Sequence, residues 1–306
     1  VGASASDVLS ANADTSEATA VASDTDNAGT YDASAATTIT ASGGSVEVSG
    51  TGTGNVTTDS ADGTTVTITG SGTYVLTGTL DDGRVVVSAE DADVRLVLAG
   101  ASITNADGPA IDVQDAGSAV MVLAEGTTNT LADGSSYADT GEDAATAALY
   151  SSDTLAITGT GSLDVTGSYK DGISSKNGLV IAGGPTITVN AADDGVRGKD
   201  YLLVSSGRLT VTAGGDGMKS SEDDDETRGF VALGAATVTV ASGDDGISAT
   251  TDVTVDGTTL SITAGGGQAS ATVSGQEPGQ GGPERGAPDQ DQSADSTEAD
   301  STPSPK

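Results

Sequence analysis

A short phrase returns four times between Leu149 and Thr263 and decides the fold. It reads Lys170-Asp171-Gly172-Ile173, Asp193-Asp194-Gly195-Val196, Gly215-Asp216-Gly217-Met218 and Asp244-Asp245-Gly246-Ile247. The steps are 22 to 24 residues, except for one of 29 residues where an acidic loop, residues 222–227, is inserted. Self-similarity at a fixed period is typical of a solenoid, in which each repeat stacks on its neighbours.

Each period also holds three short stretches in which apolar and polar residues alternate, as in strands with one buried face. Equivalent apolar positions form three series: Leu149, Ile173, Val196, Met218, Ile247; Leu155/Ile157, Leu179/Ile181, Leu202/Val204, Val231/Leu233, Val253/Val255; and Leu163/Val165, Ile187/Val189, Leu209/Val211, Val238/Val240, Leu260/Ile262. A single period cannot bury its own apolar face, so the coils must stack. The pattern predicts an all-β parallel β-helix over residues 37–267, with residues 133–145 as a loop.

The composition sets limits on function. The 306 residues include 45 acidic and 11 basic side chains, for a formal net charge of −34, and no cysteine or histidine. This charge excludes nucleic acid as a partner, because binding needs Lys and Arg to displace counterions. No run is long and apolar enough to span a bilayer. The chain begins with Val, which predicts a removed leader and an extracellular or cell-surface location. A monomer is expected.

The two ends differ from the repeats in composition. Residues 1–36 are mostly Ala, Ser, Thr and Asp, with no visible period. Residues 268–306 hold five of the seven prolines, together with Gln, Gly and Ser. Neither segment has enough apolar residues to bury, so both are predicted to be disordered.

The repeated Asp-Gly corner predicts a metal site. Equivalent residues of stacked coils lie ~4.8 Å apart, so like charges there repel by ~1 kcal/mol even in bulk water. Hard oxygen ligands that converge from several coils suit Ca²⁺. The alternative is that each Asp only hydrogen-bonds its own turn, while the glycine supplies a positive φ. The candidate ligands are Asp171, Asp193, Asp194, Asp216, Asp244 and Asp245.

Basic residues gather beside this acidic column and predict a ligand surface. Lys176 and Lys199 occupy the same place in neighbouring coils, as do Arg197 and Lys219. A cationic strip on an acidic protein indicates a site for a ligand with carboxylates or many hydroxyls. The alternative is that these side chains only balance the aspartates.

Nucleophilic triads are excluded, because the chain has neither His nor Cys. An elimination reaction remains open, since it needs only a base, a metal and a positioned uronate. Lys176 or Lys199 is the candidate base for such a polysaccharide lyase.

Several phrases resemble one family of bacterial carbohydrate-binding β-helix proteins, typified by a clostridial cellulose- and pectate-binding protein. They are Gly72-Thr73-Tyr74-Val75-Leu76-Thr77-Gly78, Val94-Arg95-Leu96-Val97-Leu98, Ala147-Ala148-Leu149-Tyr150-Ser151, Asp171-Gly172-Ile173-Ser174-Ser175-Lys176 and Asp193-Asp194-Gly195-Val196-Arg197-Gly198-Lys199-Asp200. The resemblance implies a right-handed parallel β-helix similar to family-9 pectate lyases, with bound Ca²⁺ and an extracellular setting. It also implies that Asp171, Asp194 and Asp216 match the family's acidic corners, and Lys176 and Lys199 its stacked lysines.

Residues and resemblance together predict a calcium-dependent protein that binds pectate-like or cellulose-like polysaccharide without cleaving it. A lyase and a structural or adhesive stalk are the two alternatives.

Overall fold

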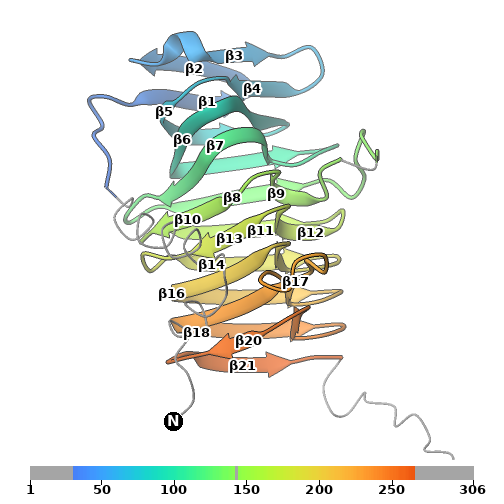
Figure 1. The fold of residues 1–306 in the computed structure, drawn as a ribbon. Coiled ribbons are helices and arrows are strands. Elements are labelled where there is room, and N and C mark those ends of the chain that lie inside the picture. The colour runs from blue at the N-terminus through green and yellow to red at the C-terminus, as the bar shows by residue number, and fades with distance from the viewer. Residues whose placement is uncertain (1–29, 142–143, 266–306) are drawn as a thin grey trace, which may run out of the picture. The chain divides into compact units, whose positions relative to one another are not determined.

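A computed structural model describes residues 30–141 and 144–265, and these residues form a parallel β-helix of about eight turns (Figure 1). Nearly all the strand pairs are parallel. The exceptions are β1–β2 and β3–β4, which are antiparallel and lie at the N-terminal end of the stack. The predicted disordered tail, residues 268–306, lies outside the described residues, as does the predicted arm apart from residues 30–36.

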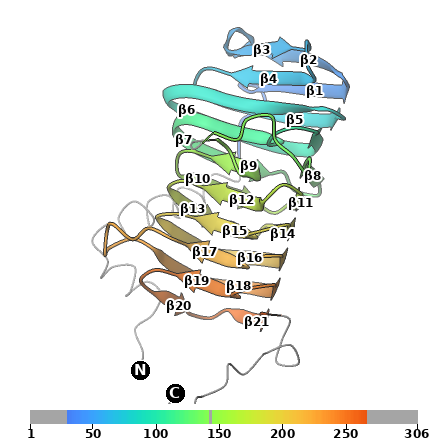
Figure 2. The ribbon, with the colours of Figure 1, turned by 90° about the vertical axis from the view of Figure 1, so that its right-hand side faces the viewer.

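The β-helix has three faces, and each coil contributes one strand segment to a face. The long strands continue around a corner, so one such strand belongs to two or three faces. Face A contains β4 (Thr64–Ile68), the first part of β6 (Gly83–Asn105) and of β7 (Ile111–Leu123), β9 (Ala147–Ser151), β12 (Asp171–Ser175), β15 (Val196–Gly198), β17 (Met218–Ser220) and β19 (Ile247–Ala249). Five of these strands, β9, β12, β15, β17 and β19, follow one another down the stack in Figure 2.

Face B follows face A along each coil. It contains the first part of β1 (Thr37–Gly43) and of β5 (Gly72–Leu80), the middle of β6, the end of β7, β10 (Leu155–Gly159), β13 (Gly178–Ile181), the first parts of β16 (Tyr201–Ala213) and β18 (Phe230–Ser242), and β20 (Val253–Val255).

Face C closes each coil. It contains the ends of β1, β5 and β6, then β8 (Thr128–Asp133), β11 (Ser162–Gly167), β14 (Thr186–Ala191), the ends of β16 and β18, and β21 (Thr259–Thr263). The remaining described elements lie at the N-terminal end of the stack. They are β2 (Ser45–Gly50), the 3-10 turn η1 (Thr53–Asn55) and β3 (Val56–Asp59).

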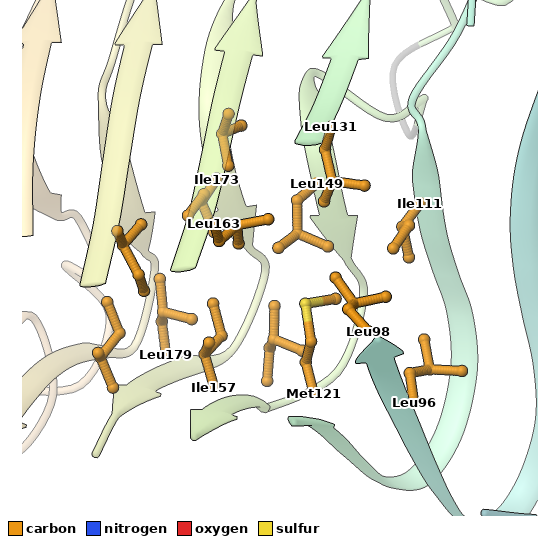
Figure 3. Packing of buried hydrophobic residues seen from close by; sticks show 14 of the residues in the cluster. Leu96, Leu98, Ile111, Met121, Leu131, Leu149, Ile157, Leu163, Ile173 and Leu179 are labelled. Carbon is orange, nitrogen blue, oxygen red and sulfur yellow. The ribbon is translucent and has the colours of Figure 1, made fainter. Parts of the chain in front are cut away.

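The core is the stack of inward-facing Val, Ile and Leu residues, as the three sequence series predict. Ile173 pairs with Leu149 and Val196, Leu179 with Leu155 and Leu202, and Ile187 with Leu163 and Leu209. In Figure 3, Leu149 and Ile173 from face A, Leu179 from face B and Leu163 from face C point into one common interior. Because each coil presents similar aliphatic side chains at the same place, the core needs no large rings.

The stack is less well covered at its C-terminal end. Val253, Val255 and Ile262 belong to the last coil, and they are 50%, 45% and 40% exposed. These residues occupy core positions, but no further described coil lies beneath them.

Candidate functional site

The Asp-Gly phrases form one corner of the β-helix, where face C ends and face A begins. Asp171, Asp194 and Asp216 stack there with their side chains buried. The backbone N–H of Asp194 donates to Oδ1 of Asp171 at 3.3 Å, that of Asp216 to Oδ1 of Asp194 at 3.0 Å, and that of Asp245 to Oδ1 of Asp216 at 3.0 Å. Each carboxylate therefore accepts a hydrogen bond from the next coil, and the corner is a hydrogen-bonded ladder.

The glycine of each phrase has a different role from the one proposed for a simple turn. Gly172, Gly195, Gly217 and Gly246 are absent from the residues with positive φ. A Cβ on Gly195 would lie 2.2 Å from Cγ1 of Val211 and 2.6 Å from the carbonyl oxygen of Gly217. The alternative interpretation, in which these glycines supply a positive φ, is therefore wrong on this point. These glycines allow the corner to pack closely against an inward valine or isoleucine of face C, and Gly172, Gly195 and Gly217 also pack against the next coil.

Lys219 supplies the positive charge in the lower part of the ladder. Its Nζ lies 3.0 Å from Oδ2 of Asp194 and 2.9 Å from Oδ2 of Asp216. Burial lowers the pKa of Lys219, but the hydrogen bonds and charges of these two aspartates outweigh it, and the net pKa is raised. Lys219 is thus held protonated between two buried carboxylates.

At the upper end of the ladder, no lysine of residues 30–141 and 144–265 forms an ion pair with Asp171. Burial and, next, the charge of Asp194 raise the pKa of Asp171 from 3.8 to about 6; Asp193 adds to the rise, and Arg197 and the Thr146 hydroxyl oppose it. Oδ2 of Asp171 accepts a hydrogen bond from Thr146 Oγ1 at 3.2 Å. The negative charge at this end is therefore compensated less than at Lys219.

The other three predicted metal ligands lie in solvent. Asp193, Asp244 and Asp245 are exposed. Asp193 and Asp244 precede the ladder position, and their backbone N–H groups donate to the carbonyl oxygens of Lys170 and Gly215. The predicted set of six is therefore three buried ladder carboxylates and three carboxylates at the surface beside them.

The four predicted basic residues lie on the adjoining face A and in its following turn. Arg197 and Lys219 are register partners on β15 and β17, in one outward row with Tyr150, Ser174 and Ser248. The Nη2 of Arg197 donates to Ser221 Oγ at 2.9 Å.

Lys176 and Lys199 each follow the end of a face A strand, one coil apart. The N–H of Lys176 donates to the carbonyl of Ser151, and that of Lys199 to the carbonyl of Ser175. Lys199 Nζ lies 2.7 Å from Oε2 of Glu222. The hydrogen bond to Glu222 raises the pKa of Lys199 and lowers that of Glu222.

An acidic group that is not among the six predicted metal ligands lies beside Lys199. Carboxylate oxygens of Glu222, Asp223 and Asp224 lie within 4.8 Å of one another, and they are the only three such ligands gathered this closely within residues 30–141 and 144–265. The backbone N–H of Asp224 donates to Glu222 Oε1, and Arg228 pairs with Asp200. The run Ser221-Glu222-Asp223-Asp224-Asp225-Glu226 is visible in the sequence, but nothing in its spacing indicated convergence.

A second loop, residues 134–146, follows the predicted loop boundaries and is fastened by aromatic side chains. Tyr137 donates a 2.7 Å hydrogen bond to Oδ2 of Asp133, and its ring stacks on Tyr169 with centroids 4.3 Å apart. Lys170 Nζ lies 5.2 Å from the Tyr169 ring centroid. Burial raises the pKa of Asp133. Two loops, 134–146 and 222–229, thus leave the corners beside face A.

The comparisons with known proteins agree with this architecture. A model of the carbohydrate-binding domain-containing protein family matches residues 62–304. The chain belongs to that family. Its match to the carbohydrate-binding domain-containing protein of Acetivibrio thermocellus is 35% identical over 116 residues, covering 37% of this chain and 40% of the relative. The chain therefore aligns with less than half of that family member's length.

A solved structure resembles about three quarters of this chain. It is described as the polysaccharide lyase-like protein from C. thermocellum, in a gadolinium derivative. The two share 28% sequence identity with a TM-score of 0.65, over 74% of this chain and 94% of the other. In the part of the family member that the structure describes, no helix has the length and apolar character needed to cross a membrane.

Proposed function

We propose that this protein binds polysaccharide outside the cell, without cleaving it, on the outer surface of face A, and that Ca²⁺ at the Asp corner strengthens the binding. The observation that carries the proposal is the outward row on face A. It places the charged or polar side chains of Arg197, Lys219, Ser174 and Ser248 on successive coils, beside Lys199 and the acidic corner.

A repeating surface suits a repeating ligand. Successive coils place equivalent groups ~4.8 Å apart, so a long polymer can meet a similar group at each step. Charged donors such as Arg197 bind carboxylates strongly, since charge-assisted hydrogen bonds are roughly twice as strong as neutral ones. The row therefore favours acidic, pectate-like chains over neutral, cellulose-like ones.

The protonation of the lysines favours binding over cleavage. A lyase needs a base that is neutral near the working pH, and enzymes obtain such a lysine by lowering its pKa. The pKa of Lys199 and that of Lys219 are instead raised by their carboxylate partners. Neither is suited to remove a proton, and Lys176 is the remaining candidate base for the alternative of a lyase.

The upper end of the ladder suits a hard cation. Asp171 and Asp194 are buried with an excess of negative charge, and the exposed carboxylate of Asp193 can rotate toward them. Carboxylate oxygens are the ligands that Ca²⁺ prefers. When bound, the cation supplies positive charge that attracts uronate carboxylates. The structural relative is described as a gadolinium derivative, and gadolinium is likewise a hard, oxygen-seeking ion. Asp216, Asp244 and Asp245 lie lower on the corner, where the positive charge of Lys219 already compensates the negative charge of the carboxylates.

The Glu222–Asp224 group is the competing calcium site, because its three carboxylates are already close together. Two variants separate the sites: Asp171→Asn with Asp193→Asn at the corner, and Glu222→Gln with Asp224→Asn in the loop. Isothermal titration with Ca²⁺ should lose the binding signal in the corner variant and keep it in the loop variant. The reverse pattern would move the site to the loop, and no signal in the unmodified protein would remove calcium from the proposal.

The polysaccharide proposal is tested by retention on polygalacturonate gel and on cellulose, with Ca²⁺ or with EDTA. Arg197→Ala with Lys199→Ala should reduce retention on polygalacturonate about tenfold or more, as expected for the loss of a few charge-assisted contacts. Arg208→Ala is the matched control, because Arg208 is an exposed arginine on face C. The control removes one positive charge and the test variant two, so a control loss half as large on a logarithmic scale would show that only overall charge matters. Ultraviolet absorbance from unsaturated products would instead identify a lyase, and Lys176→Ala should then abolish it.

A further inference from the structure

Face B carries apolar side chains on its outside as well as on its inside. The outward positions run in register down the stack: Val120 pairs with Ala156, Ala156 with Val180, Val180 with Leu203, and Leu203 with Ala232. Tyr201 stacks on Phe230 at the start of the same strands, with ring centroids 5.5 Å apart. The buried apolar residues of this outer surface are Val97, Val122, Ala156, Val180, Ala182, Tyr201, Leu203, Phe230 and Ala232, and Thr158 is a buried polar residue among them.

These outward side chains are buried, which sets face B apart from face C. Val180 is 0% exposed, Leu203 4% and Phe230 3%. The matching outward residues of face C are Asp164, Thr188, Thr210 and Thr239, and all are exposed or partly exposed. An apolar surface of this length is unfavourable in water, by about 25 cal/mol for each Å² left uncovered. Face B therefore requires a covering layer.

The described strands do not supply that layer. β10, β13, β16 and β18 pair with one another within the stack, and their other contacts are with strands of the adjacent faces. Loop 222–229 leaves the corner between faces A and B in only one coil. The apolar outer surface spans the coils from β6 to β18, so a longer segment is needed.

We propose that the chain's own N-terminal segment, residues 1–29, packs along the outer surface of face B. The segment ends where Thr30 leads into β1, and β1 is itself the uppermost strand of face B. From β1 to β18 the stack takes seven steps of ~4.8 Å, or roughly 34 Å. Twenty-nine residues span ~44 Å as a helix and ~95 Å when extended, so the segment reaches the whole surface in either form.

The composition of the two terminal segments favours the N-terminal one as the occupant. Residues 1–29 contain Val1, Val8, Leu9, Val21 and eight alanines, and no proline. Residues 266–306 contain one valine, no leucine and five prolines. The last described residue before them is Gly265, whose N–H donates to the carbonyl of Asp244 at the Asp corner. The proposal replaces the expectation that residues 1–36 form only a solvated arm.

Charge is also complementary. Residues 1–29 contain five acidic side chains and no basic one. Arg95 occupies an outward position on β6, the third strand of face B, in register with Val120. Its Nε is buried and has no hydrogen-bond partner among the described residues. An acidic segment that packs here would provide one.

Photocrosslinking in the full chain tests the contact directly. The chain has no cysteine, so Leu9→Cys introduces a single thiol for a benzophenone-maleimide label. After illumination, mass spectrometry should locate intramolecular crosslinks on β10, β13, β16 or β18. Val273→Cys in the C-terminal segment is the matched control and should give no crosslinks there. Crosslinks between two copies, crosslinks from Val273 to face B, or scattered crosslinks from residue 9 would each overturn the proposal.

A second full-chain variant tests the energetic consequence. Leu9→Asp with Val21→Asp should loosen the segment, raise the fluorescence of an added apolar dye several-fold and lower the Tm. Val273→Asp should leave both measurements unchanged. Polysaccharide retention should stay normal in both variants, because face A is untouched. Unchanged dye fluorescence and Tm in the double variant would refute the proposal even if that variant folds normally.

Discussion

Asp171→Asn offers the sharpest test of the electrostatics at the Asp corner. Its amide oxygen can still accept the N–H of Asp194, and its new NH₂ group can donate to Thr146 Oγ1, so both hydrogen bonds keep a donor and an acceptor. Only the charge is removed. The substitution therefore isolates the cost of an ionised carboxylate at the upper end of the ladder.

The magnitude follows from the pKa. Burial and the charge of Asp194 raise the pKa of Asp171 from 3.8 to about 6. Each pKa unit corresponds to 1.36 kcal/mol, so ionisation in the folded state costs about 3 kcal/mol more than in the unfolded chain. Because the folded pKa is the higher one, the stabilising contribution is fully present below pH 3.8 and is lost as the pH rises through about 6. Above that pH the asparagine variant should be the more stable protein.

The assay is urea or thermal unfolding of both proteins in EDTA, from about pH 3 to about pH 7. The difference in unfolding free energy, variant minus parent, should be near zero at the acid end and reach about 3 kcal/mol at neutral pH. For a domain of this size that corresponds to a Tm higher by about 6 °C. Asp164→Asn, at an exposed position on face C, is the control and should show no such trend. A difference that does not vary with pH, or a variant less stable at pH 7, would refute this account.

Four further predictions concern other parts of the molecule. Lys219→Met should lower the unfolding free energy by about 2 kcal/mol, because it leaves two buried carboxylates without their ion-pair partner in a partly solvated place. Adding Asp194→Asn and Asp216→Asn should restore the unfolding free energy, and a failure to do so would show that packing, not charge, is lost. Gly195→Ala should destabilise the folded protein by about 1–3 kcal/mol, because the added methyl group overpacks against Val211. Gly54→Ala should not, because the space around Gly54 is open, and equal effects would argue against close packing at the corner. Leu163→Ala, at a fully buried position, should lower the unfolding free energy by about 2–5 kcal/mol. Ile262→Ala should lower it much less, because Ile262 is 40% exposed, and equal losses would mean that the last coil is covered. Lys199→Met should leave the Tm within about 2 °C, since the Lys199 side chain is 42% exposed and ion pairs with a solvent-exposed partner contribute about 0–1 kcal/mol. A larger fall would give the acidic loop a structural role.

The repeats were predictable because a solenoid uses one rule in every coil. The inward series that begins Leu149, Ile173, Val196 is the register found in the structure, including the step of 29 residues from Met218 to Ile247. Period and alternation are enough to specify such pairing, since a slip of one residue would turn every apolar side chain outward. The antiparallel pairs at the N-terminal end lack a period, and the sequence analysis did not predict them.

The corner was only partly predictable, because spacing gives position but not hydrogen bonding. Asp-Gly indicated a turn and a stacked carboxylate. It did not indicate that Oδ1 of each aspartate accepts the N–H of the next coil, or that the glycine is needed for contact with Val211 rather than for a positive φ. Likewise the Tyr137–Tyr169 stack joins residues from separate coils that no local pattern connects.

The ladder also explains how an acidic protein tolerates a column of buried carboxylates. Backbone N–H groups satisfy one oxygen of each aspartate, and one lysine serves two of them, so the lower corner needs no further cation. At the upper corner no lysine of the described residues pairs with Asp171, and the negative charge there interacts with Arg197 on face A. A cation taken up at Asp171 would therefore relieve the folded protein and at the same time add positive charge next to the proposed polysaccharide surface. Stability and binding should then respond together to Ca²⁺, and Asp171→Asn should remove both responses. If calcium strengthens retention on polygalacturonate equally in the variant and the parent, the cation acts on the polymer alone.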